Sequence, residues 1–323
     1  MKSLIRPASP PDAADVCAVH CSDISHWRAW DASGSARPAR YADLTPCQRW
    51  LNGGPWLDPG LCRRHLQRVA EGGGYAWVAE HKGRALAEAE AFLADEPPPY
   101  GRNLNLSALY VHRHFRGQGL GSALLAAALA FAQEQGCHTF TVSRPDAPAF
   151  YAAHGLRPGP RWGHWQLPAR RSRVRYTVDP LPDTGYSLVR GYALLAGRFQ
   201  NSCHDWERAR PGGAPDFPEW RGVTLDRNWM TVRGQRAAVV LEESPRAPGT
   251  AEAFVFAPPD VALTGQWVSA IGDHAARSGF TRVNLFVPAP FAHPHAHRLE
   301  ATQRVMWKVV RGQESGVSSQ HSA

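Results

Sequence analysis

The sequence contains neither a long apolar run nor a cysteine framework. No stretch approaches the roughly 20 consecutive apolar residues that a membrane-spanning helix requires, and residues 1–7 contain no apolar signal-peptide core. Cys-x-x-Cys pairs and zinc-binding spacings are both missing among the six cysteines, Cys17, Cys21, Cys47, Cys62, Cys137 and Cys203. We therefore expect a cytoplasmic protein with reduced cysteines and no membrane partner.

Long runs of one charge are also missing. The chain is basic, with 36 Lys and Arg against 28 Asp and Glu, but the arginines are scattered. Only this net charge favours a nucleic-acid-binding protein, and we expect no nucleic-acid partner. His293, His295 and His297 alternate in a proline-rich loop without cysteine or acidic partners, so we expect surface histidines and no metal site.

The most informative stretch is Leu109 to Ser122. Alternating apolar residues in 103–108 predict a strand before it, and Leu120 to Gln135, followed by Gly136, predicts a helix after it. A glycine-rich turn that enters a helix presents free backbone N–H groups, which bind anions. A Walker loop is excluded because no Lys follows the glycines. The dinucleotide fingerprint is excluded because its glycine spacing and its acidic residue are both missing.

The spacing Arg116-x-x-Gly119-x-Gly121 resembles the acetyl-CoA loop of the GNAT superfamily of N-acetyltransferases. A second family element is matched by Ala147–Leu156, which contains Phe150 and Tyr151. The resemblance implies that backbone groups of 109–111 contact the pantetheine and thioester and that 116–122 hold the pyrophosphate. The cofactor-binding candidates are Leu109, Tyr110, Val111, Arg116, Gly117, Gln118, Gly119, Leu120, Gly121 and Ser122.

The same resemblance implies that Tyr151 protonates the departing CoA thiolate. The alternative is an ordinary half-buried tyrosine. One position departs from the family pattern: family members often carry Asn where this chain has Arg144, which puts one pantetheine contact in doubt.

Two further groups point to the acceptor side. Residues 75–80 and 85–92 predict a hairpin in which Glu88 and Glu90 share one face. These glutamates either relay a proton from the attacking amine or belong to a solvated strand face. Residues 22–60 contain Trp27, Trp30, Trp50 and Trp56, which form either an aromatic wall for the substrate or core packing.

The second half repeats the pattern without the loop chemistry. Residues 229–240 predict a hairpin, and a strand, a helix and a strand follow; residues 188–190 resemble the first strand. Pro259, Asp260, Ala262 and Thr264 align with Arg116, Gly117, Gly119 and Gly121, which predicts a cofactor-free domain.

We therefore expect an α/β (α+β) protein of two GNAT-like domains, each with a mixed, mostly antiparallel sheet flanked by helices. The expected limits are 1–168 for the acetyltransferase domain, 169–183 for a linker, 184–311 for the degenerate domain and 312–323 for a disordered polar tail.

The resemblance implies acetyl transfer from acetyl-CoA to the primary amine of a small molecule or peptide, by direct attack and without a metal. The alternative is a non-catalytic acetyl-CoA-binding or sensing protein. We expect a monomer in which the second domain acts as an internal pseudo-dimer partner.

Overall fold

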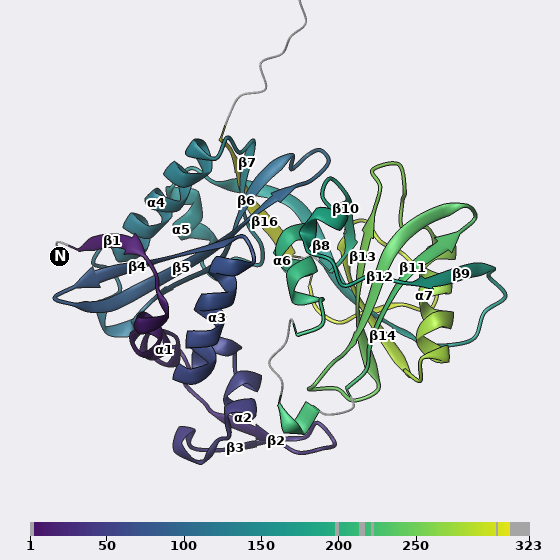
Figure 1. Cartoon of the computed structure of the whole chain (residues 1–323), viewed down its shortest axis with the longest axis horizontal. Helices are drawn as coiled ribbons and strands as arrows, with labels where there is room; N and C mark the ends of the chain where they lie inside the picture. Colours follow the sequence, from purple (N-terminus) through teal and green to yellow (C-terminus); the bar gives the residue numbers. More distant parts are fainter. Residues whose placement is uncertain (1–2, 198–199, 213–216, 221–222, 302, 311–323) are drawn as a thin grey trace, which may run out of the picture.

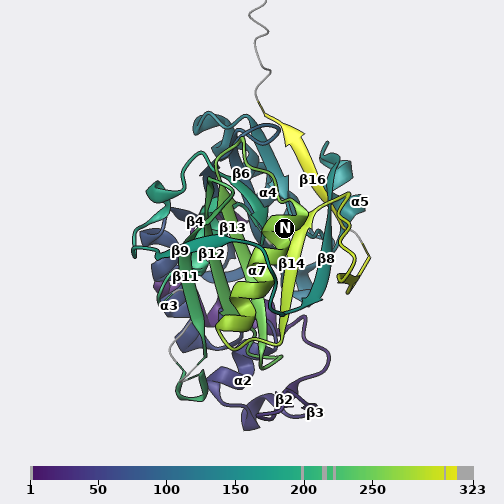
Figure 2. The same ribbon diagram turned by 90° about the vertical axis from the view of Figure 1, so that its right-hand side faces the viewer.

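One sheet runs through the whole molecule. The computed structural model describes residues 3–197, 200–212, 217–220, 223–301 and 303–310; the predicted tail at 312–323 lies outside them. Within these ranges, fourteen strands form a continuous sheet, and β2 (Arg28–Trp30) and β3 (Ala36–Pro38) form a separate hairpin. Helices cover the sheet in both halves (Figure 1 and Figure 2).

The first half of the sheet has the strand order β1, β4, β5, β6, β7. Adjacent strands in this order are antiparallel, except that β6 and β7 are parallel. The strands are β1 (Leu4–Pro7), β4 (Gly74–His81), β5 (Arg84–Asp95), β6 (Arg102–Val111) and β7 (Thr139–Val142). The helices are α1 (Ala13–Cys21), α2 (Pro46–Leu51), α3 (Pro59–Glu71), α4 (Leu120–Glu134) and α5 (Pro148–Ala153).

The alternation of strand residues decides which helix covers which face. Small residues of β5 at 87, 89 and 91 pack with Leu120, Leu124 and Leu125 of α4 in one core. Residues of the opposite face join α1 and α3 in a second core around Val16 and Leu66. Glu88 and Glu90 lie on this second face because they alternate with the alanines.

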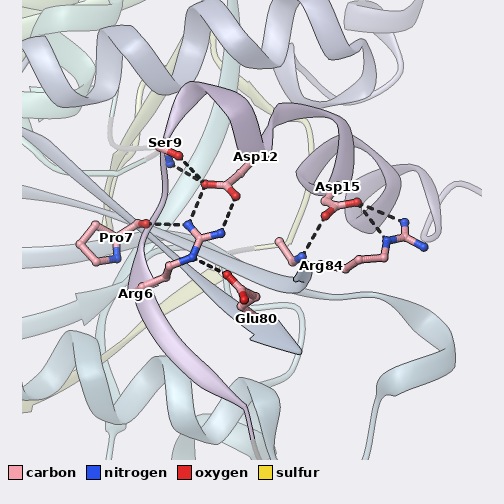
Figure 3. Close-up of polar contacts among 8 residues, drawn as sticks. Arg6, Pro7, Ser9, Asp12, Asp15, Glu80 and Arg84 are labelled. Atoms are coloured by element: carbon pink, nitrogen blue, oxygen red, sulfur yellow. Dashed lines mark hydrogen bonds and ion pairs between the residues drawn. The ribbon is translucent and has the colours of Figure 1, made fainter. Parts of the chain in front are cut away.

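A polar network ties α1 to the sheet (Figure 3). Arg6 donates to Asp12 over 2.7 Å and to Glu80 over 2.7 Å, which joins the start of α1 to β1 and β4. Asp15 of α1 accepts from the backbone N–H of Ala85 over 3.0 Å, at the start of β5. These contacts fix the course of α1 across β5 and so determine where the far end of the helix lies.

The second half repeats the order of the first. Strands β9, β11, β12, β13 and β14 correspond to β1, β4, β5, β6 and β7, and α7 connects β13 to β14 as α4 connects β6 to β7. The elements are β9 (Tyr176–Pro180), β10 (Ala193–Ala196), α6 (Ser202–Arg208), β11 (Leu225–Val232), β12 (Gln235–Glu243), β13 (Thr250–Ala257), α7 (Gly265–Arg277), β14 (Arg282–Pro288) and β15 (His297–Arg298).

Two sequence-based expectations fail here. Residues 176–180, expected within a linker, form β9 and pair with β11. Residues 186–188 form a short 3-10 helix, so the stretch at 188–190 is not the counterpart of β1. The counterpart of β1 is β9, a short strand at the edge of the sheet. The sequence analysis missed this strand because the arginine-rich residues 170–175 before it are typical of a linker.

The two halves exchange strands where they meet. The long strand β8 (Arg157–Pro168) leaves the first half and pairs with β14 of the second. The last strand, β16 (Gln303–Val309), returns to the first half and pairs with β7 on one side and with the start of β8 on the other. Each half therefore completes its sheet with a strand from the other.

Candidate active site

The glycine loop of residues 116–122 is open at its surface. Gly117 and Gly119 have positive φ angles of 73° and 84°, and Gly119 is the N-cap of α4. A Cβ atom at either glycine would meet no heavy atom within 4 Å, so free space lies directly against the backbone. Arg116 donates from Nε to the carbonyl of Val111 over 3.2 Å and forms an ion pair with Asp23. The loop thus combines an open surface, a guanidinium and the N-terminal end of a helix.

Among the residues that the structure describes, no strand pairs with one edge of β6 where it leads to this loop. β6 and β7 pair only from Asn103–Thr139 to Leu106–Val142, yet β6 continues to Val111. The other edge of β6 stays paired with β5 as far as the Val111–Ala87 pair. We call the point where β6 and β7 separate the fork. Beyond it, Leu109, Tyr110 and Val111 present one strand edge on which an extended ligand can form backbone hydrogen bonds.

Tyr151 of α5 is buried in the core cluster against which Leu109 and Val111 of β6 pack. Burial raises the pKa of Tyr151 to about 12, and the charges of Asp146 and Tyr110 contribute to the increase. The hydroxyl is therefore protonated at neutral pH. The neighbouring Phe150 packs against the glycine loop, because a Cβ at Gly121 would lie 3.6 Å from its ring.

Glu88 and Glu90 are fully buried, so the expectation of a solvated strand face is wrong. Both carboxyl groups of β5 lie beneath α1 and α3. Glu90 accepts from Trp56 Nε1 over 2.8 Å and lies 2.9 Å from His65 Nε2. Burial alone would raise the pKa of Glu90, but His65 and the hydrogen bond from Trp56 lower it to about 2. Because a carboxylate only accepts hydrogen bonds, His65 Nε2 is the donor in this contact.

Glu88 forms a different pair with His20, over 3.1 Å. Burial raises the pKa of Glu88 well above its usual range, with a further increase from Glu90, and burial lowers the pKa of His20 to about 3. Burial therefore favours the neutral form of both groups in this contact. The His20 ring lies 4.2 Å from the ring of Tyr110, centroid to centroid, which connects this pair to the unpaired edge of β6.

The tryptophans of residues 22–60 lie in different environments within the protein. Trp56 stacks on His20 with ring centroids 5.0 Å apart and donates to Glu90, so it belongs to the carboxyl cluster. Trp30 and Trp50 pack against a small core that includes Phe217 of the second half. The sequence analysis did not identify His20 or His65, because neither stands in a motif and only the packing of α1 and α3 on β5 brings them to the glutamates.

Arg144 lines a surface cavity together with Asp146 and Gln303, and residues of the second half hold its side chain. It has a φ of 51°, and its guanidinium donates to Glu300 over 3.2 Å and to Gln303 over 3.0 Å, both in the approach to β16 or its start. The strand exchange thus brings second-half residues to the end of β7.

The counterpart of the glycine loop in the second half has a different structure. Thr264 is the N-cap of α7 and accepts from the backbone N–H of Trp267 over 3.5 Å, so the helix start is capped by its own chain. Within the described ranges, no three His, Cys, Asp or Glu side chains gather closely enough to hold a metal ion. None of the helices in these ranges has the length and apolarity needed to cross a membrane.

Residues 39–156 match the model of the acetyltransferase (GNAT) family, which covers the glycine loop and α5. Residues 39–156 thus form a GNAT-family domain. The resemblance inferred from the loop and from residues 147–156 is therefore confirmed, and so is the α/β fold class.

Curated relatives of the GNAT domain carry acetyltransferase names. N-acetyltransferase 8 of Rattus norvegicus is 31% identical over 100 residues, which are 29% of this chain and 45% of the relative. A tRNA-acetylating toxin of Mycobacterium tuberculosis is 35% identical over 109 residues, or 30% of this chain and 66% of the toxin. The chain thus spans less than half of the rat protein.

Solved structures match over a larger part of the chain and show the fold. A probable N-acyltransferase from Enterococcus faecalis superposes with a TM-score of 0.56 at 10% identity, covering 96% of this chain and 73% of that one. A GCN5-related N-acetyltransferase from Anabaena variabilis has a TM-score of 0.54 at 13% identity, covering 76% of this chain and 66% of its own. The first match extends over both halves of the tandem GNAT fold.

Proposed function

We propose that the protein is an N-acetyltransferase that moves the acetyl group of acetyl-CoA to a primary amine. The observation that supports this most is the edge of β6 that leads from the fork into the open glycine loop and has no partner strand within the described residues. A pyrophosphate fits the loop because its N–H groups, the helix dipole and Arg116 all favour negative charge. A pantetheine arm carries two amides and can run along residues 109–111 like an added strand.

In this proposal the first half, 1–168, holds the cofactor and the second half holds none. Pro259 and Asp260 stand near the start of α7, where they remove a donor and add negative charge. The six free cysteines fit a reducing cytoplasm. The second half acts as an internal partner, since its β16 completes the first sheet.

Acetyl transfer is a direct attack in which one C–N bond forms and one C–S bond breaks. The backbone N–H groups of 109–111 stabilise the negative charge on the thioester oxygen. Tyr151, protonated at neutral pH, donates its proton to the departing sulfur and regains it from solvent. The acceptor loses its ammonium proton before attack.

We assign the removal of that proton to His65. Glu90 orients the ring through Nε2, and Nδ1 accepts the proton, as an imidazole held by a buried carboxylate does. The side chain of His65 is 18% exposed while that of Glu90 is 1% exposed, so the histidine is the member of the pair that solvent reaches. The neutral His20–Glu88 pair adds no charge to the site, and the His20 ring packs against the ring of Tyr110.

A panel of amines tests the proposal: small amines, aminoglycosides, peptides and aminoacyl-tRNA are mixed with acetyl-CoA, and thiol release is measured. We expect turnover with one class, and a decrease in kcat/KM on the order of 10²-fold or more for His65→Gln. His295→Gln, an exposed change in the second half, is the matched control and should retain full activity.

Acetyl-CoA binding without turnover on any amine would instead support a cofactor sensor. Salt-dependent retention on DNA with no CoA binding would support a nucleic-acid-binding protein.

A further inference from the structure

Gln200 of the second half lies just before α6 and contacts the fork. Figure 1 shows α6 at the junction of the two halves. Gln200 Nε2 donates to the carbonyl of Ser107 over 3.3 Å, and Ser143 Oγ donates to the carbonyl of Gln200 over 3.2 Å. Ser107 and Ser143 each directly follow the last β6–β7 pair, Leu106–Val142. Gln200 therefore bridges the two strands where they begin to separate.

The bridge is held by a rigid segment. Asn201 is fully buried and donates to the carbonyl of Phe92 over 2.8 Å, and the backbone N–H of Ser202 donates to Glu96 over 2.9 Å. The ring of His204 stacks on Phe92 with centroids 4.0 Å apart and an interplanar angle of 7°. The contacts of Asn201, Ser202 and His204 hold this segment against β5 and the residue that follows it. They therefore fix the position of Gln200 at the fork.

The bridge formed by Gln200 lies at one end of the β6 edge along which we propose that the cofactor binds. The glycine loop holds the opposite end, and the strand from Val111 back to Ser107 spans about 13 Å at 3.3 Å per residue. A pantetheine arm that starts at the loop and runs along this edge directs its sulfur, and the acyl group beyond the sulfur, toward the fork. Gln200 and the two serines then form the floor beneath the acyl group.

We infer that Gln200 of the second half determines the length of the acyl group that the protein accepts. This inference rests on the proposed function, because it requires acyl-CoA to lie along β6. An acetyl group is short enough to end before it contacts Gln200. Each further methylene of a longer acyl group would approach the Gln200 side chain, which is hydrogen-bonded to Ser107. One methylene in a shaped pocket changes discrimination by roughly 10-fold or more. The second half of the chain thus helps to determine which acyl-CoA serves as the acyl donor.

The test measures the dissociation constants of CoA, acetyl-CoA and butyryl-CoA for the full chain by calorimetry, so no acceptor amine is needed. We expect the wild-type protein to bind butyryl-CoA at least about 10-fold more weakly than acetyl-CoA. In Gln200→Ala that ratio should fall to within about 3-fold, while the affinity for CoA is unchanged, because truncation removes only the side-chain part of the bridge and leaves the bond from Ser143. Gln235→Ala, an exposed change in a hairpin of the same half, should keep the wild-type ratio.

The outcomes separate the two proposals. Failure of the wild-type protein to bind CoA itself would refute the proposed function and, with it, the inference. CoA binding with equal affinity for acetyl- and butyryl-CoA, or an unchanged ratio in folded Gln200→Ala, would overturn the inference alone. Gln200→Ser, which keeps a short polar side chain, repeats the comparison in case the alanine variant unfolds.

Discussion

A bulky residue at Gly119 should abolish acetyl-CoA binding while the protein stays folded. Gly119 has a φ of 84° and free space around the position of a Cβ, so the cost of a substitution to the fold is mainly the left-handed backbone. That strain amounts to roughly 1–2 kcal/mol for an L residue. Gly83, in the turn between β4 and β5, has a φ of 77° and equally free surroundings, which makes Gly83→Trp a matched control for Gly119→Trp.

Thermal unfolding with and without cofactor separates strain from binding. Each kcal/mol of strain should lower the Tm of both variants by about 2–4 °C. Acetyl-CoA at about 100 times its Kd stabilises a folded protein by about 2.7 kcal/mol, which should raise the Tm of the wild-type protein and of Gly83→Trp by several degrees. Gly119→Trp should gain nothing, because its ring fills the space that the pyrophosphate needs. Equal protection of all three proteins would refute the assignment of the loop.

Three further predictions follow from the same geometry. Tyr151→Phe should lower kcat on the order of 10²-fold and leave the Kd of acetyl-CoA unchanged; an unchanged kcat, with chemistry as the slow step, would mean that another group protonates the sulfur. Burial lowers the pKa of His204 to about 3, so only the unfolded chain takes up a proton there as the pH falls below about 6.5, and the folded state loses stability toward acid. His204→Phe should therefore reduce the loss of unfolding free energy between pH 7 and pH 5 by about 2 kcal/mol, measured by urea titration; an unchanged difference would contradict the low pKa. Calorimetric titration should give one CoA per chain, because Thr264 caps α7 and Asp260 repels phosphate; a stoichiometry of two would contradict the cofactor-free second half.

The sequence predicts most of what depends on neighbouring residues. The strand at 103–111, the loop glycines and the helix from Leu120 follow each other closely, and each is specified by its own pattern of apolar residues and glycines. The hairpin at 74–95 and the elements of the second half from β11 to β14 were predictable for the same reason. Period two also placed Glu88 and Glu90 on one face.

Distant residues decide what the sequence did not predict. The environment of Glu88 and Glu90 is set by His20 and His65, which are 68 and 25 positions away along the chain. The bridge from Gln200 to Ser107 spans 93 positions. No local pattern encodes such contacts, because they arise only when the helices and the two halves pack.

The strand exchange affects the order in which the molecule is completed as it is synthesised. Once residue 168 has left the ribosome, all the motifs of the first half exist, but the outer edge of β7 still has no neighbour. Its partner is β16, at 303–309, so the entire second half must be made before that edge is covered. Until then the nascent chain exposes the edge of β7, and β8 lacks its partner strand β14. Exposed strand edges of this kind favour association with other chains. The first half thus depends on its successor for its final shape, and a ribosome-bound fragment ending near residue 168 presents an incomplete sheet.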